Sequence, residues 1–135
     1  MKNAASKAIV VLLAALLLAS CAGGGNGGGS EAAQTLETYL NALAEKDEAV
    51  LTSLVCPDYE MDALLEFDSF QAVETELTGL DCQKTGEDGE TVLVKCQGQI
   101  DATYGNEVQS FDLGGRTYKL IQSGADWQVC GYNLE

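Results

Sequence analysis

The chain has 135 residues, enough for a single domain, and it carries 7 basic and 21 acidic side chains for a net charge of −14. A chain this acidic repels phosphate, which makes nucleic acids and anionic lipid headgroups poor partners. Because the sequence contains no histidine, it excludes histidine-based catalytic triads and histidine metal sites.

The first residues predict a cleaved export signal. Lys2 and Lys7 precede an unbroken apolar run from Ala8 to Ala19. This run is shorter than the roughly 20 residues that a membrane-spanning helix needs, and its length suits the hydrophobic part of a signal peptide. We therefore expect residues 1–20 to be a signal peptide.

The run ends in Leu18-Ala19-Ser20-Cys21, which resembles the lipobox of bacterial lipoproteins, L-[AS]-[GAS]-C. The resemblance implies cleavage between Ser20 and Cys21, a diacylglyceryl group on the Cys21 thiol and acylation of the new N-terminus. Several acyl chains would hold the protein on the extracytoplasmic side of a membrane. The alternative is a plain secretory peptide in which Cys21 has no role.

After cleavage the chain would begin with the lipidated cysteine and a tether, residues 21–30. This segment is mostly glycine, which has no side chain to pack and keeps a segment flexible. We expect Ser30 to cap a helix that begins at Glu31, and residues 31–135 to form the folded domain. Without Lys2 and Lys7 the net charge becomes −16.

Three helices are expected at the start of this domain. The first carries one apolar stripe at helical spacing, formed by Leu36, Tyr39, Leu40 and Leu43. Asp47 is a suitable N-cap for a shorter second helix, and Pro57 suits the first turn of a third. The residues expected on the inner face of the third helix are Met61, Leu64 and Leu65.

The second half of the domain predicts antiparallel strands. Apolar and polar residues alternate from Val92 to Tyr104, as in a strand with one buried face. Later in the chain the apolar residues change from odd to even positions, which predicts a one-residue bulge at Gly114-Gly115 within the third strand. The order of elements indicates an α+β fold, with N-terminal helices packed on a curved four-stranded antiparallel sheet.

The segments YLNALAEKDEAVLTSLV (39–55) and DWQVCGY (126–132) resemble small lipoproteins of the nuclear-transport-factor-2-like (NTF2-like) superfamily, also called SnoaL-like or cystatin-like rolls. The resemblance covers roughly residues 31–135 and implies a cone whose helices and sheet enclose a cavity. Such domains serve both as enzymes and as non-enzymatic ligand or partner modules, so the fold alone does not define the function.

Four cysteines follow Cys21, and an even number in an exported chain favours two disulfides, for which three pairings exist. If Cys82 and Cys96 pair across the predicted hairpin, Cys56 is left to pair with Cys130. A zinc site is disfavoured because the intervals of 26, 14 and 34 residues contain no Cys-x-x-Cys motif. No metal or other cofactor is expected.

The residues that could approach a cone cavity and act in catalysis are Asp101, Tyr39, Tyr118 and Arg116. Asp101, however, lies in the polar phase of its strand, whereas Tyr39 and Tyr118 lie on apolar stripes and suit the core. Arg116 suits an ion pair with a nearby carboxylate. No catalytic residue is therefore assigned, and a non-enzymatic role is favoured.

Two further features have structural interpretations. Asp58, Glu60 and Asp62 alternate as in a calcium-binding loop, but Ala63 occupies the position that requires glycine, so a solvated helix face explains these acids better. Trp127 is expected to anchor the core, where a small apolar ligand could also be held.

The leading hypothesis is a lipid-anchored extracytoplasmic protein that acts as a non-enzymatic binding or accessory module of the bacterial cell envelope. Its partner would be an unknown envelope protein. The alternatives are a lipoprotein that binds a small hydrophobic molecule and an isomerase- or dehydratase-like enzyme acting in the cone cavity.

Overall fold

The computed structural model describes residues 27–135. The predicted signal peptide (1–20), the predicted cleavage site between Ser20 and Cys21, and the predicted lipid attachment at Cys21 lie outside the described residues.

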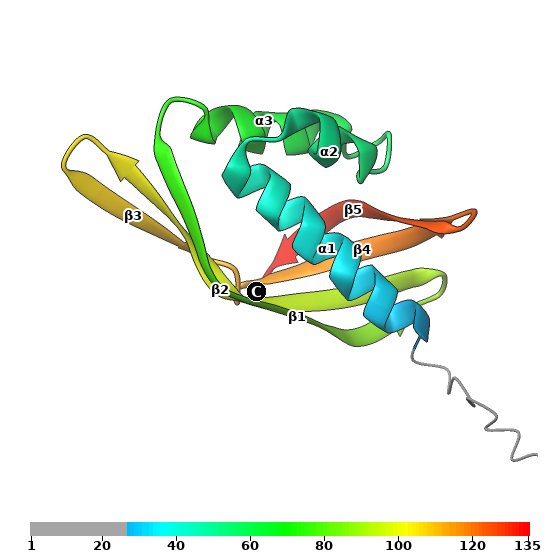
Figure 1. Ribbon diagram of the computed structural model, residues 1–135. Helices are drawn as coiled ribbons and strands as arrows, with labels where there is room; N and C mark the ends of the chain where they lie inside the picture. Colours follow the sequence, from blue (N-terminus) through cyan, green and yellow to red (C-terminus); the bar gives the residue numbers. More distant parts are fainter. Residues whose placement is uncertain (1–26) are drawn as a thin grey trace, which may run out of the picture.

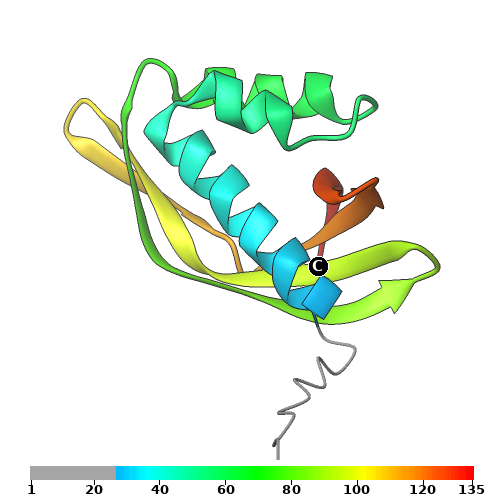
Figure 2. The same cartoon turned by 45° about the vertical axis from the view of Figure 1, so that its right-hand side comes forward.

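Three helices are followed by five strands. The helices are α1 (Gly27–Glu45), α2 (Glu48–Ser53) and α3 (Glu60–Phe70). The strands are β1 (Glu74–Asp88), β2 (Thr91–Tyr104), β3 (Glu107–Asp112), β4 (Arg116–Ser123) and β5 (Asp126–Leu134). The strands pair antiparallel in the order β1-β2-β4-β5, and β3 also pairs with β2. The helices cover one face of a curved sheet (Figure 1), and the turned view shows the sheet bending around α1 (Figure 2), which confirms the predicted α+β architecture.

Helix α1 begins four residues earlier than predicted, at Gly27 instead of Glu31, so residues 27–30 of the predicted tether are helical. These glycines let the helix approach the sheet closely. A Cβ on Gly28 would lie 3.3 Å from the Trp127 ring, and one on Gly29 would lie 2.5 Å from the side chain of Lys84. Packing against the sheet therefore overrides the weak helix propensity of glycine here.

The prediction for α2 is confirmed. The Asp47 carboxylate accepts a hydrogen bond from the backbone N–H of Val50 at 3.1 Å, which satisfies one of the free donors at the start of the helix. Leu51, a residue of α2, is fully buried.

The prediction for the inner face of α3 is wrong. The helix begins at Glu60 and not at Pro57, and Met61 and Leu65 are 71% and 62% exposed, whereas Leu64 is half-buried. The buried residues are Ala63, Phe67 and Phe70, at helical spacing. Two phenylalanine rings bury more apolar area than Met61 and Leu65, so they determine which side of the helix faces the core.

Strands β1 and β2 form a long hairpin that bends where its register shifts, between Thr78 and Asp81 and again between Lys84 and Gly86. Gly98 lies opposite the first shift with a φ of 111°, and a Cβ there would lie only 2.6 Å from the carbonyl oxygen of Thr78. Only glycine combines this positive φ with so close an approach of the two backbones.

The predicted third strand is two strands, so the sheet has five strands and not four. Both β3 and β4 pair with the same side of β2, β3 with its second half and β4 with its first. Five steps along the chain from Asp112 to Thr117 oppose four steps of β2 from Gln99 to Lys95. The single extra residue predicted around Gly114-Gly115 is present, but the chain breaks the strand there because it crosses the bend in β2.

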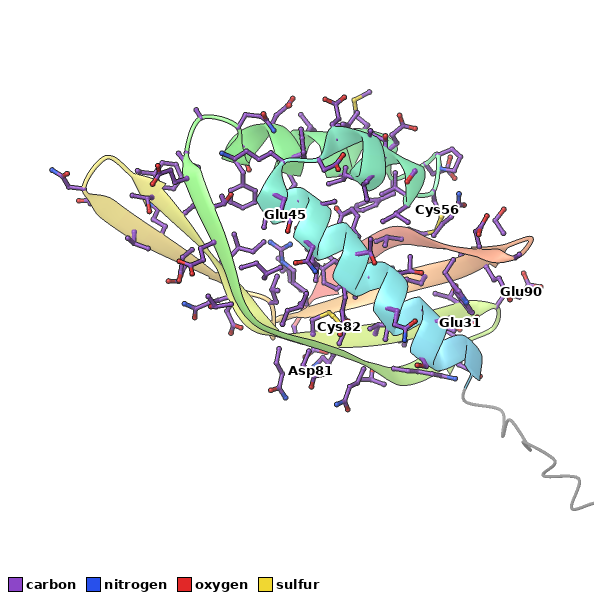
Figure 3. All side chains as sticks on the ribbon, viewed as in Figure 1. Glu31, Glu45, Cys56, Asp81, Cys82 and Glu90 are labelled. Atoms are coloured by element: carbon purple, nitrogen blue, oxygen red, sulfur yellow. A yellow bond between two sulfur atoms is a disulfide. The ribbon has the colours of Figure 1, made fainter. Side chains whose placement is uncertain are left out.

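The four cysteines lie in two pairs, as predicted. Cys82 and Cys96 are direct partners on β1 and β2, with Cα atoms 4.0 Å apart. The Cα atoms of Cys56 and Cys130 are 5.0 Å apart, and this disulfide links the loop before α3 to β5. Figure 3 shows Cys56 in that loop and Cys82 on the sheet below α1.

Candidate functional site

The polar side chains that reach the interior meet between α3 and β4. Arg116 Nη1 donates hydrogen bonds to Glu66 Oε1 at 2.6 Å and to the hydroxyl of Tyr118 at 3.2 Å. Its guanidinium carbon lies 4.4 Å from the centre of the Tyr132 ring, within cation–π range. We call the set of residues gathered here the tyrosine–arginine cluster: Tyr39, Tyr59, Glu66, Arg116, Tyr118 and Tyr132.

Two elements place the central residues of this cluster together. Glu66 precedes the buried Phe67 on α3 and therefore lies at the boundary of the buried face of the helix. Arg116 is the first residue of β4, and Tyr118, two positions later, points to the same side of the sheet. The side chains of Arg116 and Glu66 are 14% and 16% exposed, so their ion pair is largely desolvated.

Burial controls the protonation of the cluster. Burial raises the pKa of Tyr118 to about 12, although the neighbouring Arg116 opposes this rise. Burial also raises the pKa values of Tyr39 and Tyr59, and the nearby Glu66 carboxylate raises them further. The phenols therefore stay protonated at neutral pH and are suited to donating hydrogen bonds, not to abstracting protons.

Arg116 stays charged throughout the physiological range. Burial alone would lower its pKa, but the oxygens of Tyr118 and Glu66 outweigh burial and raise the pKa of Arg116 above its usual value. Two buried oxygens in the cluster, Glu66 Oε2 and the Tyr39 hydroxyl, have no hydrogen-bond partner among the described residues.

Large side chains fill the space between α1 and the sheet, where the resemblance implied a cavity. Tyr39 and Tyr118 are both 0% exposed. The other large residues that are less than 2% exposed are Leu36, Leu40, Leu43, Leu51, Ile100, Leu113, Leu120, Val94, Val129 and Cys96. An interior packed in this way leaves little room for a substrate.

An open hollow of about 1010 Å³ lies between α3 and the last strand. We call it the α3–β5 groove. Asp58, Asp62, Leu65 and Glu66 line it on the helix side, Cys130–Leu134 line it on the strand side, and Lys119 also borders it. Glu66 therefore belongs to both the tyrosine–arginine cluster and the wall of this groove.

The structure brings three of the four residues considered for catalysis into the tyrosine–arginine cluster and leaves Asp101 outside it. Arg116 pairs with a carboxylate, and Tyr39 and Tyr118 are core residues, as the sequence indicated. Asp101 instead lies apart from the cluster, where its carboxylate accepts hydrogen bonds from Ser110 and Gln99, which lower its pKa.

Sequence reasoning did not identify Glu66, Tyr59 or Tyr132. Glu66 could be found only with the correct orientation of α3, because its position beside Phe67 places it at the edge of the buried face. Asp58, Glu60 and Asp62 do not come together as potential metal ligands, and no group of three or more such ligands is found among the described residues. Within residues 27–135, no helix has the length and apolar character to cross a membrane.

No protein-family profile matches the chain, and no curated protein is similar to it in sequence. Solved structures are similar in fold. Aln2 from a Streptomyces species has a TM-score of 0.55 and 11% identity, and the match covers 78% of this chain and 88% of Aln2. A proposed dehydratase of the NTF2-like family from Streptomyces avermitilis has a TM-score of 0.52 and 15% identity, covering 78% of this chain and 92% of that protein.

An NTF2-like protein with a cystatin-like fold from Novosphingobium aromaticivorans has a TM-score of 0.50 and 14% identity, and the match covers 74% of this chain and 75% of that protein. Identities this low carry information on the fold alone. The described domain therefore has the NTF2-like, cystatin-like fold that the sequence predicted.

Proposed function

We propose that this protein is a bacterial lipoprotein whose NTF2-like domain is a non-enzymatic binding or accessory module of the cell envelope. In this proposal Cys21 carries the lipid anchor on the extracytoplasmic side of a membrane. The observation that carries the non-enzymatic role is the filled interior, in which Tyr39 and Tyr118 occupy the space that a substrate would need. The raised pKa values of the buried phenols also leave them unsuited to act as general bases.

Two observations favour an enzyme or a small-ligand protein as the second candidate. Glu66 Oε2 and the Tyr39 hydroxyl are buried polar atoms without partners among the described residues, and buried polar atoms usually have one. In addition, one protein with a similar fold is a proposed dehydratase. A ligand bound beside Tyr39 would have to displace core side chains. If the domain is a non-enzymatic binding module, titration with small carbonyl compounds should therefore leave the NMR signals of Tyr39 and Tyr118 unchanged.

The lipid anchor is tested by replacing its sulfur. Cys21→Ser removes the thiol that would receive the diacylglyceryl group, so the protein should leave the membrane fraction and lose incorporated radioactive palmitate. Ser20→Ala is the matched control because alanine satisfies the lipobox at that position, and it should behave as wild type. Equal membrane attachment and labelling of wild type and Cys21→Ser would refute the anchor.

The binding role is tested separately, by cross-linking the membrane-attached wild-type protein in its host and identifying the captured partners by mass spectrometry. The same partners should be recovered in independent experiments. A wild-type protein that turns over a substrate and captures no reproducible partner would refute the binding role.

A further inference from the structure

Strand β5 forms an edge of the sheet next to the helices, and this edge is only partly covered. Strand β5 is last in the strand order and pairs with β4 on one side. On its other side, the start of the strand is covered by the segment before α3. Cys56 N–H donates to the Val129 carbonyl at 2.9 Å, and Val129 N–H donates to the Leu54 carbonyl at 2.7 Å.

Beyond Val129 the cover is partial, because Gly131 is buried and a Cβ there would lie 3.7 Å from the Tyr59 ring. For residues Cys130–Leu134 the described chain provides no further strand on that side, and the α3–β5 groove runs there instead. Proteins commonly protect such edges with lysine, proline or inward-pointing charges. The register shift against β4 also places a bulge at Cys130 and Gly131, and bulges protect edges as well. The open part of this edge is therefore Tyr132-Asn133-Leu134, which contains no lysine, proline or charged residue.

The groove combines an edge strand with apolar and acidic side chains. Leu65 and Leu134 line it and are 62% and 76% exposed, which is unusual for leucine. Asp58 and Asp62 are exposed on its helix wall, and among the described residues that line it the single cation is Lys119. The groove therefore offers backbone hydrogen bonds, two apolar contacts and a negative rim.

The walls of the groove are held together covalently. The Cys56–Cys130 disulfide joins the loop that leads into α3 to the strand that forms the opposite wall. A groove that is already fixed in shape loses less conformational entropy when a ligand binds.

We propose that the α3–β5 groove binds an extended, basic peptide segment of a partner protein, which adds to the free edge of β5 as an extra strand. Strand addition supplies affinity through main-chain hydrogen bonds and selectivity through alternate side chains. Leu65 and Leu134 would contact the apolar side chains of the segment, and Asp58 and Asp62 its lysine or arginine side chains. The inference names the partner class for the proposed binding role, on which it rests, and does not depend on the lipid anchor.

The negative charge of the groove favours a basic segment over a second copy of this chain as its occupant. Two copies joined edge to edge would bring Asp58 and Asp62 of each copy near each other, in a protein whose net charge is −14. Like charges across an interface oppose association, whereas a basic segment is attracted over long distances.

The test uses the purified wild-type chain in a non-ionic detergent, with a fluorescent heptapeptide that alternates lysine with valine, leucine and threonine. We expect saturable binding, and weaker binding of the same peptide with glutamate in place of lysine. Asp58→Asn/Asp62→Asn should weaken binding about two- to thirtyfold, since exposed ion pairs contribute about 0.2–1 kcal/mol each. Asp88→Asn/Asp126→Asn is the matched control, because it changes the net charge equally at exposed strand ends outside the groove.

Amide exchange locates the bound peptide. The basic peptide should slow exchange of backbone N–H groups within residues 130–134, and Leu65→Gln should weaken binding without affecting the unfolding midpoint. The inference is overturned if both double variants weaken binding equally, if the two peptides bind equally, if exchange in β5 is unchanged, or if sedimentation shows that a second copy occupies the groove. None of these results bears on lipidation, and Cys21→Ser should bind the peptide as wild type does.

Discussion

Replacing Gly98 by alanine tests whether the bend in the sheet depends on close contact between two backbones. The new Cβ would lie 2.6 Å from the Thr78 carbonyl oxygen and 2.9 Å from the carbonyl carbon and oxygen of Gly79. All three are backbone atoms, so no flexible side chain can move aside. The positive φ of 111° adds about 1–2 kcal/mol for a residue with a side chain, and the overlap adds about 1–3 kcal/mol. The smaller entropy of the unfolded alanine chain offsets about 0.4–1 kcal/mol, so Gly98→Ala should lower the free energy of unfolding by about 1–4.6 kcal/mol.

Gly89→Ala is the matched control for this experiment. Gly89 also has a positive φ, 61°, but a Cβ there would meet no atom within 4 Å. The stability loss of Gly89→Ala should therefore be limited to the backbone strain, about 0–1.6 kcal/mol after the same entropy correction. Urea unfolding followed by the fluorescence of Trp127, the only tryptophan, measures both losses. Equal losses for the two variants would refute the argument that backbone contact at Gly98 determines the bend.

Two further predictions concern charged groups. Arg116→Met should destabilise the domain by about 3 kcal/mol because it leaves the Glu66 carboxylate desolvated without its partner, and Arg116→Met/Glu66→Leu should recover most of this loss in the same urea assay. A double variant that is less stable than the single variant would contradict this account. Ser110→Ala should raise the pKa of Asp101, as followed by NMR titration, because hydrogen bonds from Ser110 and Gln99 hold that pKa below its ordinary value. A folded-state pKa below the unfolded value stabilises the fold above the unfolded pKa, and this contribution is lost as pH falls through the folded pKa, so the variant should lose less stability than wild type on acidification.

Local sequence patterns were sufficient for much of the fold. The apolar spacing of α1, the Asp47 cap of α2 and the one-residue insertion after Asp112 all depend on neighbours along the chain, and each is present. The errors arose where contacts between residues far apart in the sequence determine the structure. The start of α1 depends on how closely glycines approach Trp127 and Lys84, and neither contact can be read from the helix itself.

The same distinction applies to the candidate site. The sequence suggested that Arg116 pairs with a carboxylate, but the identity of that carboxylate depends on the rotation of α3 about its axis. Choosing Met61 and Leu65 as the inner face placed Glu66 on the wrong side. Phe67 and Phe70 compete with them for burial, and the sheet surface, which includes Phe111 in edge contact with Phe70, selects the aromatic pair.

The loop before α3 contacts β5, and this contact explains both the filled interior and the position of the exposed groove. The Val55–Val129 bridge and the Cys56–Cys130 disulfide hold that loop against the start of the strand, so the helices close over Tyr39 and Tyr118. The backbone hydrogen bonds stop at Val129 and Tyr59 covers Gly131, so only the last three residues of β5 keep a free edge beside α3. The backbone N–H and C=O groups that remain unpaired at this edge are accessible to molecules that bind on the outside of the domain. This is the physical reason to search for a peptide partner before a substrate.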